Sequence, residues 1–169
     1  MDAESTNNEI KIGLDFSDSC ILYRLVHNTF LVGGSKRPRA NIFNPETDGL
    51  STDWNRYSTP EDCLIRTGLT YKFKKNEFKV PGDFQVYSLN VGKIRTIEQI
   101  SDLQHTPVYN NPELIGQPNN PSHSSVFYID EEVRLKLAEF AEKVEDIDID
   151  AIHNKIEQKK ITLFAQIIK

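Results

Sequence analysis

Apolar residues follow the pattern of β-strands at three places along the chain. Residues 20–26 (CILYRLV) and 84–91 (FQVYSLNV) are rich in aliphatic and aromatic side chains and contain neither glycine nor proline. Such segments are typical of strands that face a core. Residues 124–129 predict a third strand of this kind. Shorter strands are predicted at residues 40–43, 50–53 and 69–73, and residues 94–97 extend or follow the second strong strand.

The clearest helix signal is the segment Ser58-Thr-Pro-Glu-Asp62. Thr59 fits an N-cap, Pro60 fits the first turn, and Asp62 can reach back to the cap as in a capping box. We expect this helix to end near Thr67, with Gly68 just after its C-cap.

Two later helices are predicted from apolar residues at helical spacing. One begins after the capping residue Asp130 and runs to about residue 144. The other spans residues 151–168, where Ile152, Ile156, Leu163 and Ile167 form one row beside a second apolar row. Packing on the chain's own sheet explains such a helix, and so does contact with a protein partner or a second copy of the chain.

Strands in the middle and helices towards the end indicate an α+β domain with a twisted, mostly antiparallel sheet. The pattern divides the chain into an acidic N-terminal extension (residues 1–19), the α+β domain (20–144) and a C-terminal helix (145–169). Long loops at residues 28–49 and 105–123 contain many prolines, glycines and asparagines. Loops of this length are often functional, so we expect the two to converge over one face and form a pocket.

Charge is distributed unevenly over the 169 residues. The chain has 20 basic and 25 acidic residues, a formal net charge of −5, yet residues 20–95 have an excess of basic residues. This local excess favours a small anionic ligand, while the overall charge is unfavourable for general nucleic-acid binding. The densest basic clusters are Lys36, Arg37 and Arg39, and Lys72, Lys74, Lys75 and Lys79.

The sequence argues against a membrane-spanning, secreted or disulfide-rich protein. No apolar run is long enough to span a membrane, and the first twenty residues do not have the pattern of a signal peptide. The two cysteines make no disulfide framework. We therefore expect a cytoplasmic protein with no membrane partner.

Four polar residues at strand ends and in the long loops are candidates for a site. Arg24 shares a strand face with Leu22 and Val26, so it lies in a cleft or extends from an edge. His27 follows three residues later, and His105 and His123 lie in the second long loop, where a rigid sheet presents reactive groups. Two paired imidazoles could perform acid–base phosphoester chemistry. A zinc site with Asp53 or Glu61 is a weaker alternative, and we predict no metal.

Residues 21–67 resemble the start of RES-domain proteins. The resemblance rests on Leu22-Tyr-Arg24 in a strand, the Gly33-Gly34 loop, Asn44-Pro45, Leu50-Ser-Thr52 and the helix that starts at Ser58. RES-domain proteins are toxins of ADP-ribosyltransferase-like fold that degrade NAD. Ser51 stands where that family has a tyrosine, and no late glutamate ends a strand. The chain is also similar to small uncharacterised bacterial proteins that share Tyr-Arg-x-x-His and Asn-Pro-x-His motifs.

The first resemblance implies a set of NAD-binding residues. Arg24 would contact the phosphates or a ribose, with help from Arg37 or Arg39, and Ser51 or Thr52 would support the nicotinamide ribose. The expected function is a nucleotide- or NAD-directed transferase or glycohydrolase, a toxin or defence component, with catalytic candidates Arg24, His27, Ser51, His105 and His123. The alternatives are a histidine-based phosphoesterase or RNA-processing enzyme, and a non-enzymatic binding module.

Overall fold

A six-stranded sheet forms the centre of the computed structural model, which describes residues 16–33, 37–44, 49–100, 102–111, 116–127 and 130–167. Its strand order is β6-β7-β2-β1-β5-β8, and every neighbouring pair is antiparallel. The α+β class with a mostly antiparallel sheet is thereby confirmed. The strands are β1 (Ile21–His27), β2 (Leu50–Trp54), β5 (Phe84–Asn90), β6 (Asp102–His105), β7 (His123–Phe127) and β8 (Glu142–Lys143).

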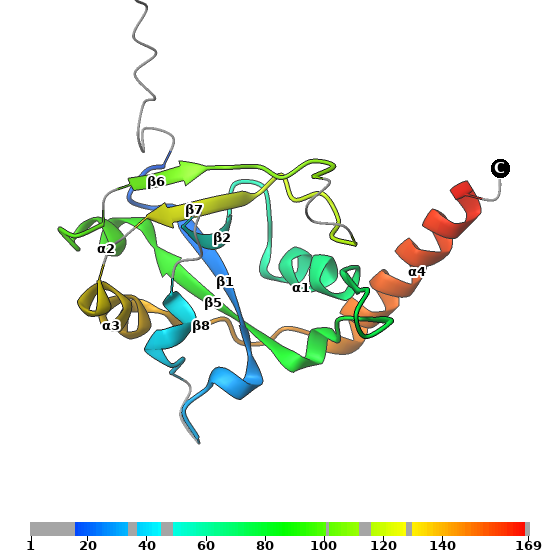
Figure 1. Cartoon of the computed structure of the whole chain (residues 1–169), viewed down its shortest axis with the longest axis horizontal. Helices are drawn as coiled ribbons and strands as arrows, with labels where there is room; N and C mark the ends of the chain where they lie inside the picture. Colours follow the sequence, from blue (N-terminus) through cyan, green and yellow to red (C-terminus); the bar gives the residue numbers. More distant parts are fainter. Residues whose placement is uncertain are drawn as a thin grey trace, which may run out of the picture.

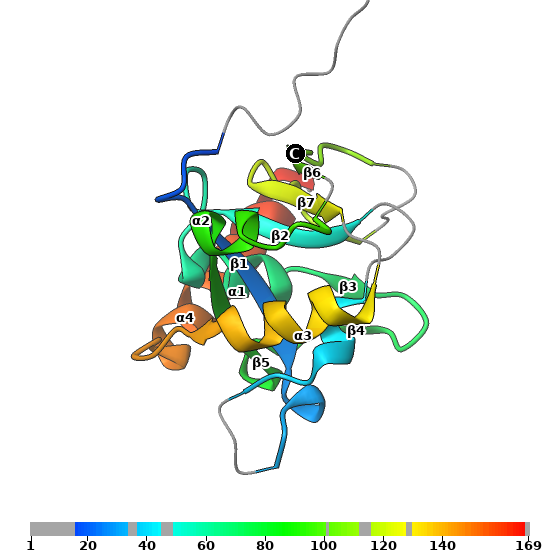
Figure 2. The ribbon, with the colours of Figure 1, turned by 90° about the vertical axis from the view of Figure 1, so that its left-hand side faces the viewer.

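Helices cover both faces of this sheet (Figures 1 and 2). α2 (Val91–Arg95), α3 (Glu131–Phe140) and the 3-10 turn η2 (Ala40–Phe43) lie on one face, where they enclose Leu22 and Val26 of β1 in the larger core. α1 (Pro60–Gly68) and α4 (Ile149–Ile167) lie on the other, against Tyr23 and Leu25. Successive residues of β1 thus face different cores, as the alternation of a strand requires.

The remaining elements are short. A two-stranded hairpin, β3 (Tyr71–Lys72) and β4 (Glu77–Phe78), is separate from the main sheet and follows α1 along the chain. The turns η1 (Asn28–Phe30) and η3 (Pro81–Asp83) are single 3-10 turns. Within the described residues, no helix is both long and apolar enough to cross a membrane.

The predicted cap of α1 is confirmed. The Thr59 hydroxyl accepts from the Asp62 backbone N–H (3.2 Å), and the Asp62 carboxylate accepts from the Thr59 N–H (3.0 Å). Gly68 is the last helical residue rather than a cap after the helix. An ideal Cβ there would lie 2.3 Å from Cδ1 of Ile156 and 2.9 Å from Cγ of Pro81. Glycine is therefore used here to let α1 approach α4 closely.

Three short predictions were wrong. Residues 40–43 form the turn η2, because Ile42 and Phe43 are both buried and a strand would send them to opposite faces. Residues 91–95 form α2, which the Asn90 side chain caps by accepting from the Lys93 N–H. The helix that begins after Asp130 ends at Phe140, since residues 142–143 pair with the free edge of β5 as β8.

The first half of the C-terminal helix α4 packs against the rest of the domain. Ile152 and Ile156 are buried together with Leu64 and Ile65 of α1, while Ile161 is 68% exposed. The side chains of Leu163 and Ile167 lie outside the described residues, as do residues 1–15. Figure 1 shows the end of α4 extending beyond the body of the domain.

Candidate functional site

Strands β1 and β2 separate at the centre of the sheet. They pair at only two positions, Leu22 with Trp54 and Tyr23 with Asp53. Beyond Tyr23 the ladder stops, and the Arg24 guanidinium bridges the fork by donating from Nη1 to the Ser51 carbonyl (2.8 Å). Its Nη2 donates to the carbonyl of Ile42 in η2 (3.0 Å). Arg24 thus ties the two diverging strands and the overlying turn together.

A cavity of about 340 Å³ lies beside this fork. Its walls come from β1 and β2, from the polar side of α1, from Lys79 after the hairpin, and from the loop residues Gln117, Pro118 and Asn120 together with His123. This volume is at the lower end of the range for small-molecule sites. The described residues of segment 28–49 line a second cavity with Arg24, on the side of η2, and none of them lines the first. For this part of the loop, the expectation that both long loops converge on one pocket was wrong.

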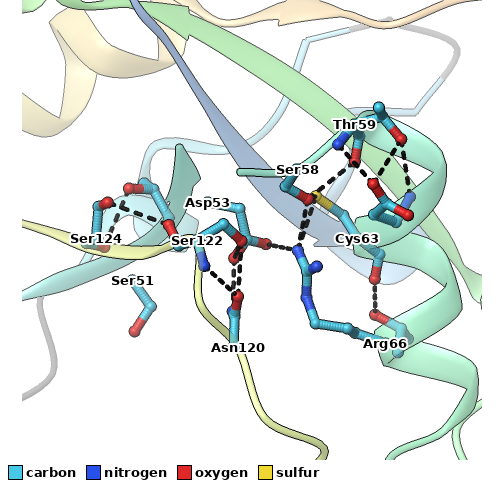
Figure 3. A network of polar contacts seen from close by, with 12 residues as sticks. Ser51, Asp53, Ser58, Thr59, Cys63, Arg66, Asn120, Ser122 and Ser124 are labelled. Atoms are coloured by element: carbon cyan, nitrogen blue, oxygen red, sulfur yellow. Dashed lines mark hydrogen bonds and ion pairs between the residues drawn. The ribbon is translucent and has the colours of Figure 1, made fainter. Parts of the chain in front are cut away.

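Asp53 and Arg66 form an ion pair in the cavity wall (Figure 3). Nη2 of Arg66 lies 3.2 Å from Oδ2 of Asp53, and their side chains are only 17% and 12% exposed. The Asn120 amide donates to Oδ1 of Asp53 (2.6 Å), and the Ser122 hydroxyl lies 3.1 Å from the same oxygen. The carboxylate is therefore held by three side chains from two distant segments.

Arg66 retains donors that can reach a ligand. Its Nη2 atom also donates to the Ser58 hydroxyl (2.8 Å), as Figure 3 shows. Among the residues that the structure describes, its Nη1 and Nε atoms make no hydrogen bond. A guanidinium with unused donors at a cavity wall is a suitable partner for a phosphate or carboxylate.

Cys63 also lines the cavity, but it is not a nucleophile. Its side chain is fully buried, and this burial, together with the nearby charge of Asp53, raises the pKa of the Cys63 thiol well above its ordinary value. Because only the thiolate is a strong nucleophile, Cys63 acts as a packing residue between Ser58 and Arg66.

His123 is oriented by Thr106, the residue that follows β6. Its Nδ1 atom lies 2.8 Å from the Thr106 carbonyl oxygen and 2.9 Å from the Thr106 hydroxyl. A carbonyl oxygen can only accept, so the network assigns the proton to Nδ1 and leaves the lone pair on Nε2. His123 lies opposite Asp53 in the β2–β7 ladder and lines the cavity. This is the arrangement of an imidazole that can accept a proton.

Positive charge prevails in the cavity lining. Arg24, Arg66 and Lys79 contribute to it, whereas Asp53 is the one carboxylate among the described lining residues. Burial, and to a smaller extent the charge of Lys72, lowers the pKa of the Lys79 ammonium. The positive potential of this cavity favours an anionic guest, although the protein as a whole is acidic.

The structure brings together four of the eight residues that the sequence suggests for catalysis or NAD binding. Arg24, Ser51, Thr52 and His123 all line the cavity at the fork. The remaining four lie elsewhere: His27 caps η1 through a contact of its Nδ1 with Thr29, His105 stacks on Tyr57, and Arg37 and Arg39 are exposed. The part of the first basic cluster that is described therefore contributes nothing to this cavity.

His105 and His123 lie on opposite faces of the sheet. His105 is paired with Ser124, the residue after His123, and its ring stacks on Tyr57 and packs edge-on against Trp54. Its Nε2 contacts the Pro121 carbonyl (2.7 Å). The two-imidazole geometry that a paired-histidine phosphoesterase needs is therefore not formed.

Sequence reasoning missed the roles of Arg66, Asn120 and Ser122. The available signal was the position of Arg66 on α1, three residues after the buried Cys63 and thus on the same helix face. A cation on the covered face of an amphipathic helix requires a partner. Within the described residues, no three His, Cys, Asp or Glu side chains come close enough together to hold a metal ion.

Comparison of the chain with protein-family models, with curated proteins and with solved structures finds no match in any of the three.

Proposed function

We propose that this protein is a nucleotide-directed enzyme whose cavity at the fork binds the phosphates of its substrate and cleaves or transfers its glycosidic bond. The observation that carries the proposal is the juxtaposition of the Arg66 guanidinium, whose Nη1 and Nε have no partner among the described residues, with an imidazole, His123, whose tautomer is fixed by the Thr106 carbonyl. NAD is the substrate that the resemblance to RES-domain proteins implies.

Each part of the cavity supports one part of this reaction. Arg66 and Lys79 supply positive charge for phosphate oxygens, and Arg24, which the resemblance assigns to NAD contact, lies at the same fork. Ser51 and Thr52 line the wall next to it. Tyr23 adds a hydrogen-bond donor, because burial raises the pKa of its hydroxyl and keeps it protonated.

His123 acts as the general base. In the glycohydrolase reaction the bond between nicotinamide and ribose breaks, and a water oxygen bonds to the ribose carbon. The proton of that water passes to Nε2 of His123 and then to solvent, and the products are nicotinamide and ADP-ribose. In the transferase reaction an acceptor hydroxyl replaces the water. General-base catalysis of this kind contributes roughly 10²- to 10⁴-fold in rate.

The test is nicotinamide release from NAD, together with melting temperatures in the presence of NAD, ADP-ribose and AMP. We expect His123→Asn to lower turnover by at least about 10²-fold, because its side-chain amide can still donate to Thr106 but has no group in the place of Nε2. Nucleotide binding should persist in this variant and be lost in Arg66→Gln.

The matched control is His153→Asn, since His153 is exposed on α4 and should not change turnover. Absence of nicotinamide release, combined with absence of a melting-temperature shift by any of the three nucleotides, would overturn the proposal. Equal turnover in His123→Asn and the wild type would remove His123 from the mechanism.

A further inference from the structure

The hairpin of β3 and β4 has an excess of positive charge. Residues 71–79 contain four lysines, Lys72, Lys74, Lys75 and Lys79, and one acidic residue, Glu77. Glu77 is paired with Lys72 (3.2 Å). Among the residues that the structure describes, Lys74, Lys75 and Lys79 form no ion pair. In a protein of net charge −5, this concentration creates a local positive potential that favours an anionic partner.

An exposed aromatic ring lies within this basic hairpin. Phe73 follows β3 directly, is 60% exposed, and packs edge-on against Tyr71 with its ring centroid 5.0 Å away. The Tyr71 N–H donates to the Gly116 carbonyl and ties the hairpin to another segment of the chain, while the Lys79 N–H donates to the Thr70 carbonyl and closes the base of the hairpin. One side of the ring lies against Gly116, and the exposed remainder is a platform on which a nucleobase can stack.

The hairpin is continuous with the cavity at the fork. Thr70 and Lys79, which flank it on either side, both line that cavity. The ammonium of Lys79 also lies 5.9 Å from the ring centroid of Phe84, and the residue is half-buried at the cavity wall. Positive charge therefore extends from the cavity wall along the hairpin to its tip at Lys74 and Lys75.

We propose that the hairpin binds single-stranded nucleic acid, so that a nucleotide within or at the end of a strand supplies the acceptor hydroxyl that replaces water in the transferase reaction. This inference rests on the proposed function and names the class of its acceptor substrate. The hairpin lysines contact the phosphates that flank the reacting nucleotide, and Phe73 stacks on a neighbouring base. An acidic polypeptide would satisfy the lysines but would make no use of the exposed ring.

The experiment measures binding of a fluorescent single-stranded oligoadenylate of about 12 nucleotides, a length within the usual site sizes, by anisotropy. Three lysines in contact with phosphates predict a slope of log K against log salt of about −2, since each contributes about −0.7 on single strands. The double variant Lys74→Ala/Lys75→Ala should reduce this slope to about −0.7. Phe73→Ala should weaken binding by about tenfold and Phe73→Trp should restore it, because stacking tolerates any aromatic ring.

The matched control removes two lysines far from the hairpin, Lys93 of α2 and Lys136 of α3, which lie on the opposite face of the sheet. Equal weakening by this control would mean that only net charge matters and would overturn the proposal. Equal competition by a polyglutamate peptide would overturn it as well. AMP binding is measured on the same variants: if AMP binds the wild type and the oligonucleotide does not, this inference fails while the proposed function stands.

Discussion

Asp53 of β2 and Arg66 of α1 form a largely buried ion pair, with Nη2 and Oδ2 3.2 Å apart. The pair connects the central sheet to the helix that covers it and fixes the cavity wall on that side. Its two members are thirteen residues apart in the chain and come from elements of different type. The cost of taking both charges out of water is offset only if each keeps its partners.

We predict that Asp53→Asn lowers the free energy of unfolding by about 3 kcal/mol, the usual cost of leaving one buried charge without its partner. The variant retains Oδ1 for Asn120 and Ser122, so the loss isolates the contact with Arg66. Urea denaturation measures it. The exposed pair Lys136–Glu132 on α3 is the control, and its removal should change stability by less than about 1 kcal/mol. Equal effects at the two pairs would contradict the prediction.

Anion binding should depend on pH through Lys79. Burial and Lys72 lower the pKa of this lysine below its ordinary value of 10.5. The charged form, which attracts the anion, is complete below the lowered pKa and is lost as pH rises through it. AMP affinity should be measured between about pH 7 and pH 10. It should begin to fall at a lower pH than the one at which an exposed lysine loses its proton.

Lys79→Arg tests the assignment, since a guanidinium stays charged over this range. Its AMP affinity should be constant where that of the wild type declines. The same shift predicts that the free energy of unfolding rises with pH between the two pKa values of Lys79, where the unfolded chain binds more protons. A wild-type affinity that does not change with pH would show that Lys79 does not contact the anion.

Gly68→Ala should destabilise the protein although it lies in a helix. Alanine gains about 1 kcal/mol over glycine in helix propensity, but crowding in a packed core costs about 1–3 kcal/mol, and here the new methyl would meet Ile156 and Pro81. Because the crowding is severe, we expect the cost to exceed the gain and the free energy of unfolding to fall by about 1–2 kcal/mol. Thermal or urea unfolding measures it.

Ile156→Val removes Cδ1, the atom nearest to the new alanine methyl. The double variant with Gly68→Ala should therefore recover part of the lost stability. Gly82→Ala is the control, because a Cβ there meets nothing within 4 Å. A Gly68→Ala variant as stable as the wild type would mean that α1 and α4 can separate without cost.

The two cysteines should differ in reactivity. Burial raises the pKa of Cys63. At Cys20, burial also acts to raise the pKa, but hydrogen bonds to Ser17 and the charge of Arg95 outweigh it, so the pKa is lowered. Iodoacetamide near neutral pH should alkylate Cys20 first and Cys63 only after denaturation, as peptide mass spectrometry would show. Comparable rates in the folded protein would contradict the burial of Cys63.

Local signals were enough for several elements. The Thr59 capping box, the cap at Asp130 and the strands at the centre of the sheet follow from neighbouring residues alone, because caps and side-chain alternation act within a few positions. Local signals failed where a tertiary contact favoured another structure. Residues 142–143 pair with β5 and do not continue the preceding helix. Ile42 and Phe43 lie in a turn that buries both side chains.

The sequence by itself determined the fold class, most strand positions, the start of α1 and the presence of a basic middle in an acidic chain. Only the tertiary structure decided which of these residues meet. A one-residue change of register moves a side chain to the other face of a sheet, and the β6–β7 register separates His105 from His123 while the β2–β7 register places His123 beside Asp53. Pairing between distant strands depends on how the whole core packs, so no short segment of the chain encodes it.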